Sequence, residues 1–261
     1  MSHSKSIALM GIAALTAYIF TLSSVSADLG YCKFSDLIER EVNADNVAFL
    51  HVTAGAGELE ITGQNRQNIK IVARLCSNNE EALRGMNVSD KTNNKTLRIQ
   101  TQFPKDSFWG RDHKTSIDLA LFVPQSLALK VKDSSGSTEI AKVASLDIVD
   151  SSGELNIEDI AGDVIVVDSS GALNIENING NVTITDSSGD IEVRSVEHNL
   201  TIEVDSSGAI EADHIKGHVL VKVDSSGAII VNNVNGDFTV TKDSSGGIKH
   251  NGVKGRVSLP K

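Results

Sequence analysis

Residues 150–168 read DSSGELNIEDIAGDVIVVD, and residues 168–186 repeat this pattern as DSSGALNIENINGNVTITD. The tetrapeptide Asp-Ser-Ser-Gly occurs seven times, at intervals of 17, 18, 18, 19, 19 and 19 residues. Its copies begin at Asp133, Asp150, Asp168, Asp186, Asp205, Asp224 and Asp243. A nearly constant interval is the signature of a repeat architecture, in which each unit packs on the next.

Apolar and polar residues alternate inside each period. In the first stretch quoted, residues 155–160 (LNIEDI) and 164–167 (VIVV) are separated by a second turn at Gly162. This alternation predicts two short strands, each with one buried face. Two strands cannot bury that face alone, but coils stacked on one another can. The sequence therefore predicts an all-β fold, a single-chain β-solenoid with two strands in each coil of 17–19 residues.

The first 27 residues have a different character from the rest of the chain. An apolar stretch from Ile7 to Leu22 follows a short basic start, and Val25–Ala27 fits a small-x-small cleavage pattern. This arrangement predicts a secretory signal peptide at residues 1–27. An uncleaved membrane anchor is the alternative. We expect an exported protein, periplasmic or at the cell surface, whose mature chain has no membrane span.

Residues 28–131 are less regular than the repeat and contain several strand-like runs. We predict that they form a β-rich N-terminal cap on a seven-coil solenoid at residues 132–261. Cys32 and Cys76 are the only cysteines, and an even pair in an exported protein predicts a disulfide. Two free thiols are the alternative.

One loop brings aromatic and basic residues together. Phe108, Trp109 and Arg111 lie within the segment 104–114, which makes them a candidate partner contact. The alternative is that this loop covers the core of the cap.

The repeated aspartates allow two interpretations. Asp, Ser and Gly are turn residues, because Asp and Ser accept hydrogen bonds from nearby amides and Gly adopts positive φ. Stacking, however, would place the carboxylates about 5 Å apart, where like charges repel unless they are solvated, protonated or bridged. A weak Ca²⁺ site along the seven aspartates is therefore the second interpretation. No other cofactor and no other metal site is expected.

The second turn of each coil holds a smaller polar cluster. Aligning the periods places Asn199, His218 and Asp237 in one column, with Glu197 over Lys216. Imidazole and carboxylate groups could hold a transition metal. Surface turn residues without that role are the alternative, and the Glu197–Lys216 pair is expected to be an exposed ion pair.

Charge and composition exclude several functions. With 24 Lys and Arg against 34 Asp and Glu, the net charge is −10, which argues against binding nucleic acid. The chain contains no His-Glu-x-x-His, no Gly-x-Ser-x-Gly and no phosphate loop. We therefore assign no catalytic residue and expect a protein that is not an enzyme.

The Asp-Ser-Ser-Gly turns, the Gly-x-Ile-x-Val strands and the Leu-Phe-Val-Pro run at Leu121–Pro124 resemble the bacterial putative-adhesin family of exported β-solenoids. The resemblance covers about residues 45–260 and implies adhesion. We expect a monomeric binding or structural module of the cell envelope, whose partner is a surface or envelope protein or a glycan. A carbohydrate-active enzyme on a similar scaffold and a periplasmic structural scaffold are the alternatives.

Overall fold

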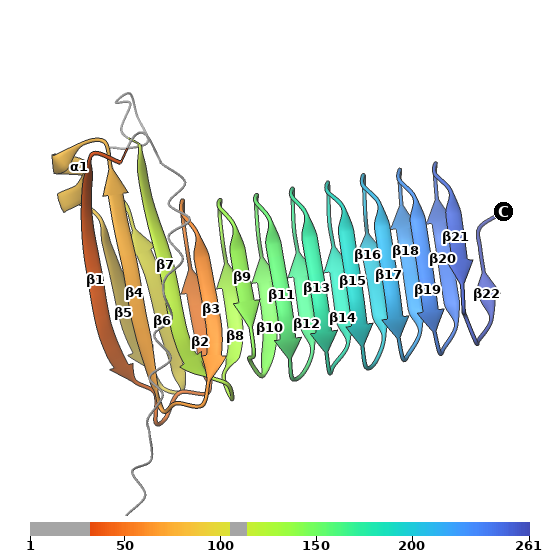
Figure 1. Cartoon of the computed structure of the whole chain (residues 1–261), viewed down its shortest axis with the longest axis horizontal. Helices are drawn as coiled ribbons and strands as arrows, with labels where there is room; N and C mark the ends of the chain where they lie inside the picture. The colour runs from red at the N-terminus through yellow and green to blue at the C-terminus, as the bar shows by residue number, and fades with distance from the viewer. Residues whose placement is uncertain (1–31, 105–113) are drawn as a thin grey trace, which may run out of the picture. The chain divides into compact units, whose positions relative to one another are not determined.

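The computed structural model describes residues 32–104 and 114–261, which belong to one compact unit, Tyr31–Lys261. The predicted signal peptide and the loop residues Phe108, Trp109 and Arg111 lie outside the described residues. Within these residues the chain forms two sheets of 11 strands each and one short helix (Figure 1). The predicted all-β solenoid is confirmed.

The two sheets, called A and B here, run the length of the stack. In spatial order, sheet A contains β1 (Phe34–Asn43), β4 (Asn68–Ser77), β7 (Thr115–Pro124), β3 (Leu59–Gln64), β9 (Thr138–Ala141), β11 (Leu155–Ile160), β13 (Leu173–Ile178), β15 (Ile191–Val196), β17 (Ile210–Ile215), β19 (Ile229–Val234) and β21 (Ile248–Asn251). Sheet B contains β22 (Val257–Ser258), β20 (Phe238–Asp243), β18 (Val219–Asp224), β16 (Leu200–Val204), β14 (Val182–Thr185), β12 (Val164–Val167), β10 (Ser145–Val149), β8 (Ala128–Lys132), β2 (Phe49–Thr53), β6 (Thr96–Gln102) and β5 (Asn87–Asn93).

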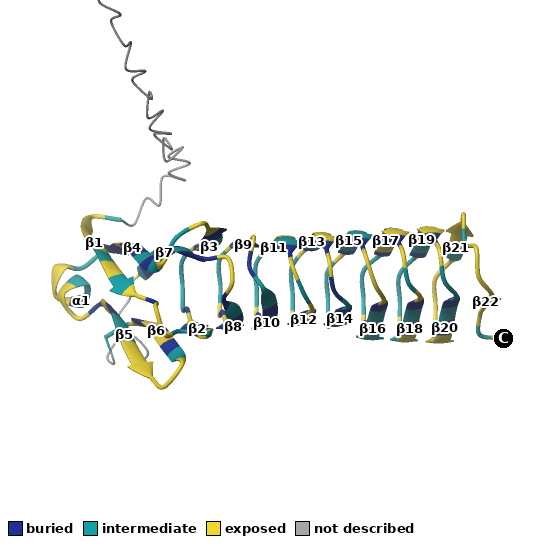
Figure 2. Ribbon diagram, turned by 90° about the horizontal axis from the view of Figure 1, so that it is seen from below, coloured by how far each residue is buried: buried dark blue, intermediate teal, exposed yellow. Residues whose placement is uncertain are grey.

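From β8 onward the chain alternates between the sheets, and equivalent strands pair in parallel, in register except for a shift after Ile184 in the pairing of β14 with β16. Leu155 pairs with Leu173, for example, and Ile157 with Ile175. Like residues therefore stack on like, and the aliphatic side chains on the inner faces are almost fully buried. Figure 2 shows these buried positions along both rows of strands.

A residue in the left-handed conformation explains why three apolar side chains point inward from each of the sheet A strands β11, β13, β15, β17 and β19. Strict alternation would bury positions 155, 157 and 159, yet Leu155, Ile157 and Ile160 are buried. Asp159 has φ 56°, which turns the strand so that Ile160 faces the core. The equivalent residues of the following coils have the same conformation, namely Asn177, Ser195, His214 and Asn233.

The glycine that ends each tetrapeptide has no room for a side chain. Gly189 has φ 137°, and a Cβ atom added there would lie 1.6 Å from the carbonyl oxygen of Gly171. The other glycines of this column are equally close to their neighbours. Glycine is thus required both by the backbone conformation and by the close approach of successive turns.

The stack of coils begins before the first Asp-Ser-Ser-Gly. Strands β2 and β3 pair in parallel with β8 and β9, and Ala56 forms a bridge with Ser135. The turn between them reads Ala-Gly-Ala-Gly at residues 54–57, and Gly57 shares the positive φ of the repeat glycines. Strand pairing is therefore continuous across residue 131. The division into a cap and a seven-coil domain stays a prediction.

Antiparallel strands cover the N-terminal end of the stack. In sheet A, β4 pairs antiparallel with both β7 and β1, and in sheet B, β5 pairs antiparallel with β6. The helix α1 (Glu80–Arg84) joins the two sheets, and the Asn79 side chain accepts a hydrogen bond from the Ala82 amide at its start. The predicted disulfide between Cys32 and Cys76 is present and ties the start of β1 to β4.

We expect Gly189→Ala to lower the free energy of unfolding by more than about 2 kcal/mol, because the new Cβ collides with the backbone of Gly171 in the preceding turn and residue 189 has an unfavourable φ. Gly247→Ala is the matched control, since a Cβ at that position meets no atom within 4 Å. Urea unfolding of both variants measures the difference. Equal stability of the two would contradict this account of the glycine column.

The disulfide is expected to stabilise the protein by about 4 kcal/mol, because it closes a long loop of the unfolded chain. The Cys32→Ser/Cys76→Ser double variant should therefore unfold at lower urea concentration than the unmodified protein. Adding a reductant should lower the stability of the unmodified protein alone. An unchanged unfolding midpoint in the double variant would refute the prediction.

Candidate functional site

The repeated aspartates form a buried column. Asp205 is aligned with Asp224, and Asp224 with Asp243, because the turns stack in register. Six of the seven side chains are at most 2% exposed, namely Asp133, Asp150, Asp168, Asp186, Asp205 and Asp224. We call the seven repeated aspartates, including Asp243, the aspartate column. Asp243, in the last turn, is only half-buried.

The two serines of each tetrapeptide connect successive turns. The second serine donates a hydrogen bond to the backbone carbonyl of the first serine one coil earlier, as Ser188 Oγ does to Ser169 at 3.1 Å. The same bond recurs along the stack at Ser152, Ser170, Ser226 and Ser245. Together with the stacked glycines, these bonds give the tetrapeptide a role in every coil-to-coil contact.

Burial raises the pKa of the six buried column aspartates above the ordinary value for the side chain. It raises the pKa of Asp133 and Asp186 to about 6, and repulsion from a neighbouring carboxylate adds to the effect. Asp205 has neighbours on both sides, Asp224 and Asp186, and its pKa is raised to about 7. At Asp205 the backbone N–H of Ser207 donates a hydrogen bond to Oδ1 at 3.2 Å, which lowers the pKa in part.

The second turn column is held by bonds from side chain to backbone. His218 donates its backbone N–H to Asn199 Oδ1 at 2.9 Å, and His218 Nδ1 accepts the Asp237 N–H at 2.8 Å. Asp237 Oδ1 in turn accepts the Arg256 N–H at 2.8 Å. The predicted column exists, and its polar atoms cap the amides of the next coil.

One further expectation concerns the second turn column. The predicted exposed ion pair forms, with Lys216 Nζ 2.6 Å from Glu197 Oε1.

Within residues 32–104 and 114–261, no group of three or more His, Cys, Asp or Glu side chains is arranged to hold a metal ion. Within the same residues, no helix is long and apolar enough to cross a membrane.

The outer faces of the two sheets differ in character. Sheet A presents a series of acidic side chains, including Glu139, Glu158 and Glu176. Sheet B presents apolar side chains that are between 37% and 49% exposed, namely Phe49, Val149, Ile165, Val167 and Val204. Val149 and Val167 are register partners on adjacent strands, and Ile165 lies beside them on β12. We call Phe49, Val149, Ile165 and Val167 the sheet B patch.

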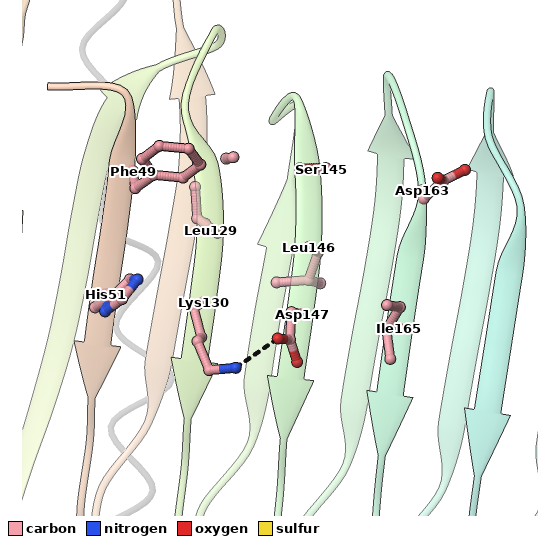
Figure 3. A pocket seen from close by; sticks show the side chains of 10 residues that line it. Phe49, His51, Leu129, Lys130, Ser145, Leu146, Asp147, Asp163 and Ile165 are labelled. Atoms are coloured by element: carbon pink, nitrogen blue, oxygen red, sulfur yellow. Dashed lines mark hydrogen bonds and ion pairs between the residues drawn. The ribbon is translucent and has the colours of Figure 1, made fainter. Parts of the chain in front are cut away.

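A shallow groove of about 360 Å³ lies in this face between β2 and β12 (Figure 3). Phe49 and Ile165 line it at opposite ends, and the Lys130 Nζ to Asp147 Oδ2 ion pair, 2.6 Å long, lies between them. His51 completes the N-terminal end. Partial burial and the positive charges of Arg98 and Lys130 lower the pKa of His51, which favours the neutral ring.

The two carboxylates of the groove are engaged in structural contacts. Asp147 is paired with Lys130, and Asp163 Oδ1 accepts the backbone N–H of Asn181 at 2.8 Å. That hydrogen bond lowers the pKa of Asp163. A glycosidase needs one carboxyl group of raised pKa to donate a proton to the leaving group. The groove is therefore suited to contact rather than to hydrolysis.

The sheet B patch was not predicted, although the sequence contains a signal for it. Ile165 and Val167 occupy positions where the next coil has Thr183 and Thr185, so they are apolar at outward positions of the alternation. Comparing equivalent positions between coils would have separated them from the core residues of the run 164–167.

Most of the chain matches a known protein family. A family model described as Toastrack DUF4097 matches residues 47–255. The chain belongs to this family. The resemblance to a family of adhesin-like β-solenoids is thereby confirmed. A comparison with curated proteins gave no match.

Several solved structures resemble the Toastrack chain. A putative lipid-binding protein from Parabacteroides distasonis is 16% identical, with a TM-score of 0.48, and the match covers 87% of this chain and 97% of that one. A putative adhesin from Bacteroides fragilis is 13% identical, with a TM-score of 0.39 and coverage of 86% and 97%. A putative cell adhesion protein from Clostridium sporogenes is 11% identical, with a TM-score of 0.38 and coverage of 87% and 100%.

Proposed function

We propose that this Toastrack protein is an exported, non-enzymatic binding module of the cell envelope, and that it contacts its partner through the sheet B patch. One observation carries the proposal. Among the described residues, five of the nine exposed large apolar side chains lie on this single sheet face. Exposed apolar side chains that gather on one face are characteristic of interaction surfaces.

The chemistry of the patch favours a protein partner over a glycan. Val149, Ile165 and Val167 present aliphatic surface, and the lysines of β8 lie between them and Phe49 on β2. Protein interfaces combine apolar and polar side chains in this way. Sugar-binding surfaces rely on aromatic platforms, and Phe49 is the one exposed phenyl ring on the described part of this face.

Two features support export. The chain begins with a segment that has the pattern of a secretory signal, and the disulfide between Cys32 and Cys76 is of the kind that persists in oxidising compartments. The resemblance to the putative-adhesin family favours adhesion at the cell surface as the role of the exported protein.

The patch is tested by Ile165→Glu, which places a charge among aliphatic side chains at an outward position. We expect beads coated with this variant to lose at least about tenfold in adhesion to target cells, because the charge must be desolvated on contact. Thr239→Glu is the matched control, since Thr239 occupies the equivalent outward position on β20, away from the patch. Equal adhesion of both variants would exclude the patch as the contact surface.

The chemical class of the partner is tested with the same beads. Treating the target cells with protease should abolish adhesion, whereas oxidising their glycans with periodate should leave it intact. The opposite pattern would replace the protein partner by a glycan.

The location is tested by protease treatment of intact cells that carry a peptide tag after Lys261. Exposure at the surface predicts loss of the tag, and cleavage of the signal predicts a mature chain that begins at Asp28 by mass spectrometry. A tag that is lost only after the outer barrier is opened would favour a periplasmic scaffold.

A further inference from the structure

The aspartate column contains carboxylate oxygens without donors. In Asp150, Asp186 and Asp224, neither oxygen accepts a hydrogen bond from a protein donor, although these side chains are at most 1% exposed. Asp133, Asp168 and Asp205 each have one buried carboxylate oxygen that accepts no hydrogen bond from a protein donor. Buried polar atoms are nearly always paired, so this many unpaired oxygens in one column indicates a missing ligand.

The surroundings of the column make full ionisation unfavourable. The groups that face each carboxyl are the aspartates one coil above and below, the backbone amides of the following serines and, at Asp133, the Thr138 hydroxyl. Among the described groups that shift these pKa values, every charged one is another aspartate. A row of buried anions about 5 Å apart would be destabilised both by burial and by mutual repulsion.

We propose that the aspartate column is a proton-binding site, in which carboxyl groups of adjacent coils share protons along the interior of the stack. A proton between two carboxyls supplies the missing donor and removes one charge from each pair. It also requires no additional space. Between Asp133 and Asp150 the proton would relieve the repulsion from Asp150 that, after burial, raises the pKa of Asp133.

A metal cation fits the column less well than a proton. Ca²⁺ requires six to eight oxygen ligands around one point, whereas the column is linear and each aspartate has at most two neighbours of its kind. Within the described residues, no three acidic side chains converge on a common centre. The proton needs two oxygens only, and adjacent coils provide them.

Proton binding makes the stability of the fold depend on pH in a defined direction. The folded-state pKa values are raised, so the stabilisation is complete below the unfolded value of about 3.9 and is lost as the pH rises through about 6 to 7. Asp163, Asp213 and Asp237 have lowered pKa values and act in the opposite direction, but only below about pH 4. The lowered pKa of His51 also acts in the opposite direction, because below about pH 6.5 the unfolded chain binds a proton there more readily than the folded protein does. Six aspartates with raised pKa values outweigh this one histidine, so the protein should be more stable at pH 5 than at pH 8.

The direct test is a carbon-13 NMR titration of the aspartate side-chain carboxyls in the purified protein. We expect Asp133 and Asp186 to titrate with midpoints near 6 and Asp205 near 7, and Asp150, Asp168 and Asp224 above the usual value for the side chain. The melting temperature should be higher at pH 5 than at pH 8 by about 4 °C or more. Midpoints below 4 for every aspartate would overturn the proposal.

Variants and Ca²⁺ separate the proton from its alternatives. Asp186→Asn supplies a neutral side chain of the same shape, so it should raise the melting temperature at pH 8 and reduce the difference between pH 5 and pH 8. Glu176→Gln removes the same charge from an exposed position of sheet A and should change neither. The proposal is overturned if the two variants behave alike, or if millimolar Ca²⁺ at pH 8 restores the stability seen at pH 5.

Discussion

Parallel stacking in register is the constraint on which the rest of this structure depends. Because nearly every strand residue lies over its equivalent in the next coil, each side chain must be compatible with a copy or near copy of itself. Ile on Ile fills the core, Gly on Gly permits close turns, and Ser on Ser forms a hydrogen-bonded ladder. The same constraint places Asp on Asp, which is unfavourable for charged groups. The buried carboxyls are therefore a consequence of the repeat, and protonation is the means by which the fold tolerates them.

The repeat made most of the fold predictable, since a period, an alternation and a turn signature all indicated the same structure. The coil formed by β2 and β3 was not predicted, because its turn reads Ala-Gly-Ala-Gly and only Gly57 keeps the required conformation. The left-handed residues were also missed. Their positions are occupied by Asp, Asn, Ser and His. These residue types tolerate a positive φ, but their presence alone does not predict it. The antiparallel strands at the N-terminal end have no period, so tertiary pairing determines them.

The candidate site was harder to predict than the fold, because it depends on exceptions to the repeat. Ile165 and Val167 matter because their neighbours in the next coil are threonines, and Phe49 because it comes from a coil without the tetrapeptide. Inside the stack, repetition of Asp at the same position of successive coils produces the proton-binding column. Outside, loss of repetition produces the patch.

Whole coils are the units in which such a protein can change length. Each central coil contacts only the coils on either side of it, and all central coils present the same turns and inner faces to one another. Duplicating or deleting one of them preserves every pairing rule and moves the two ends of the stack by one strand spacing, about 4.8 Å. Related chains with different numbers of repeats would thus form a graded set of spacers, each holding its N-terminal patch at a different distance from its C-terminus.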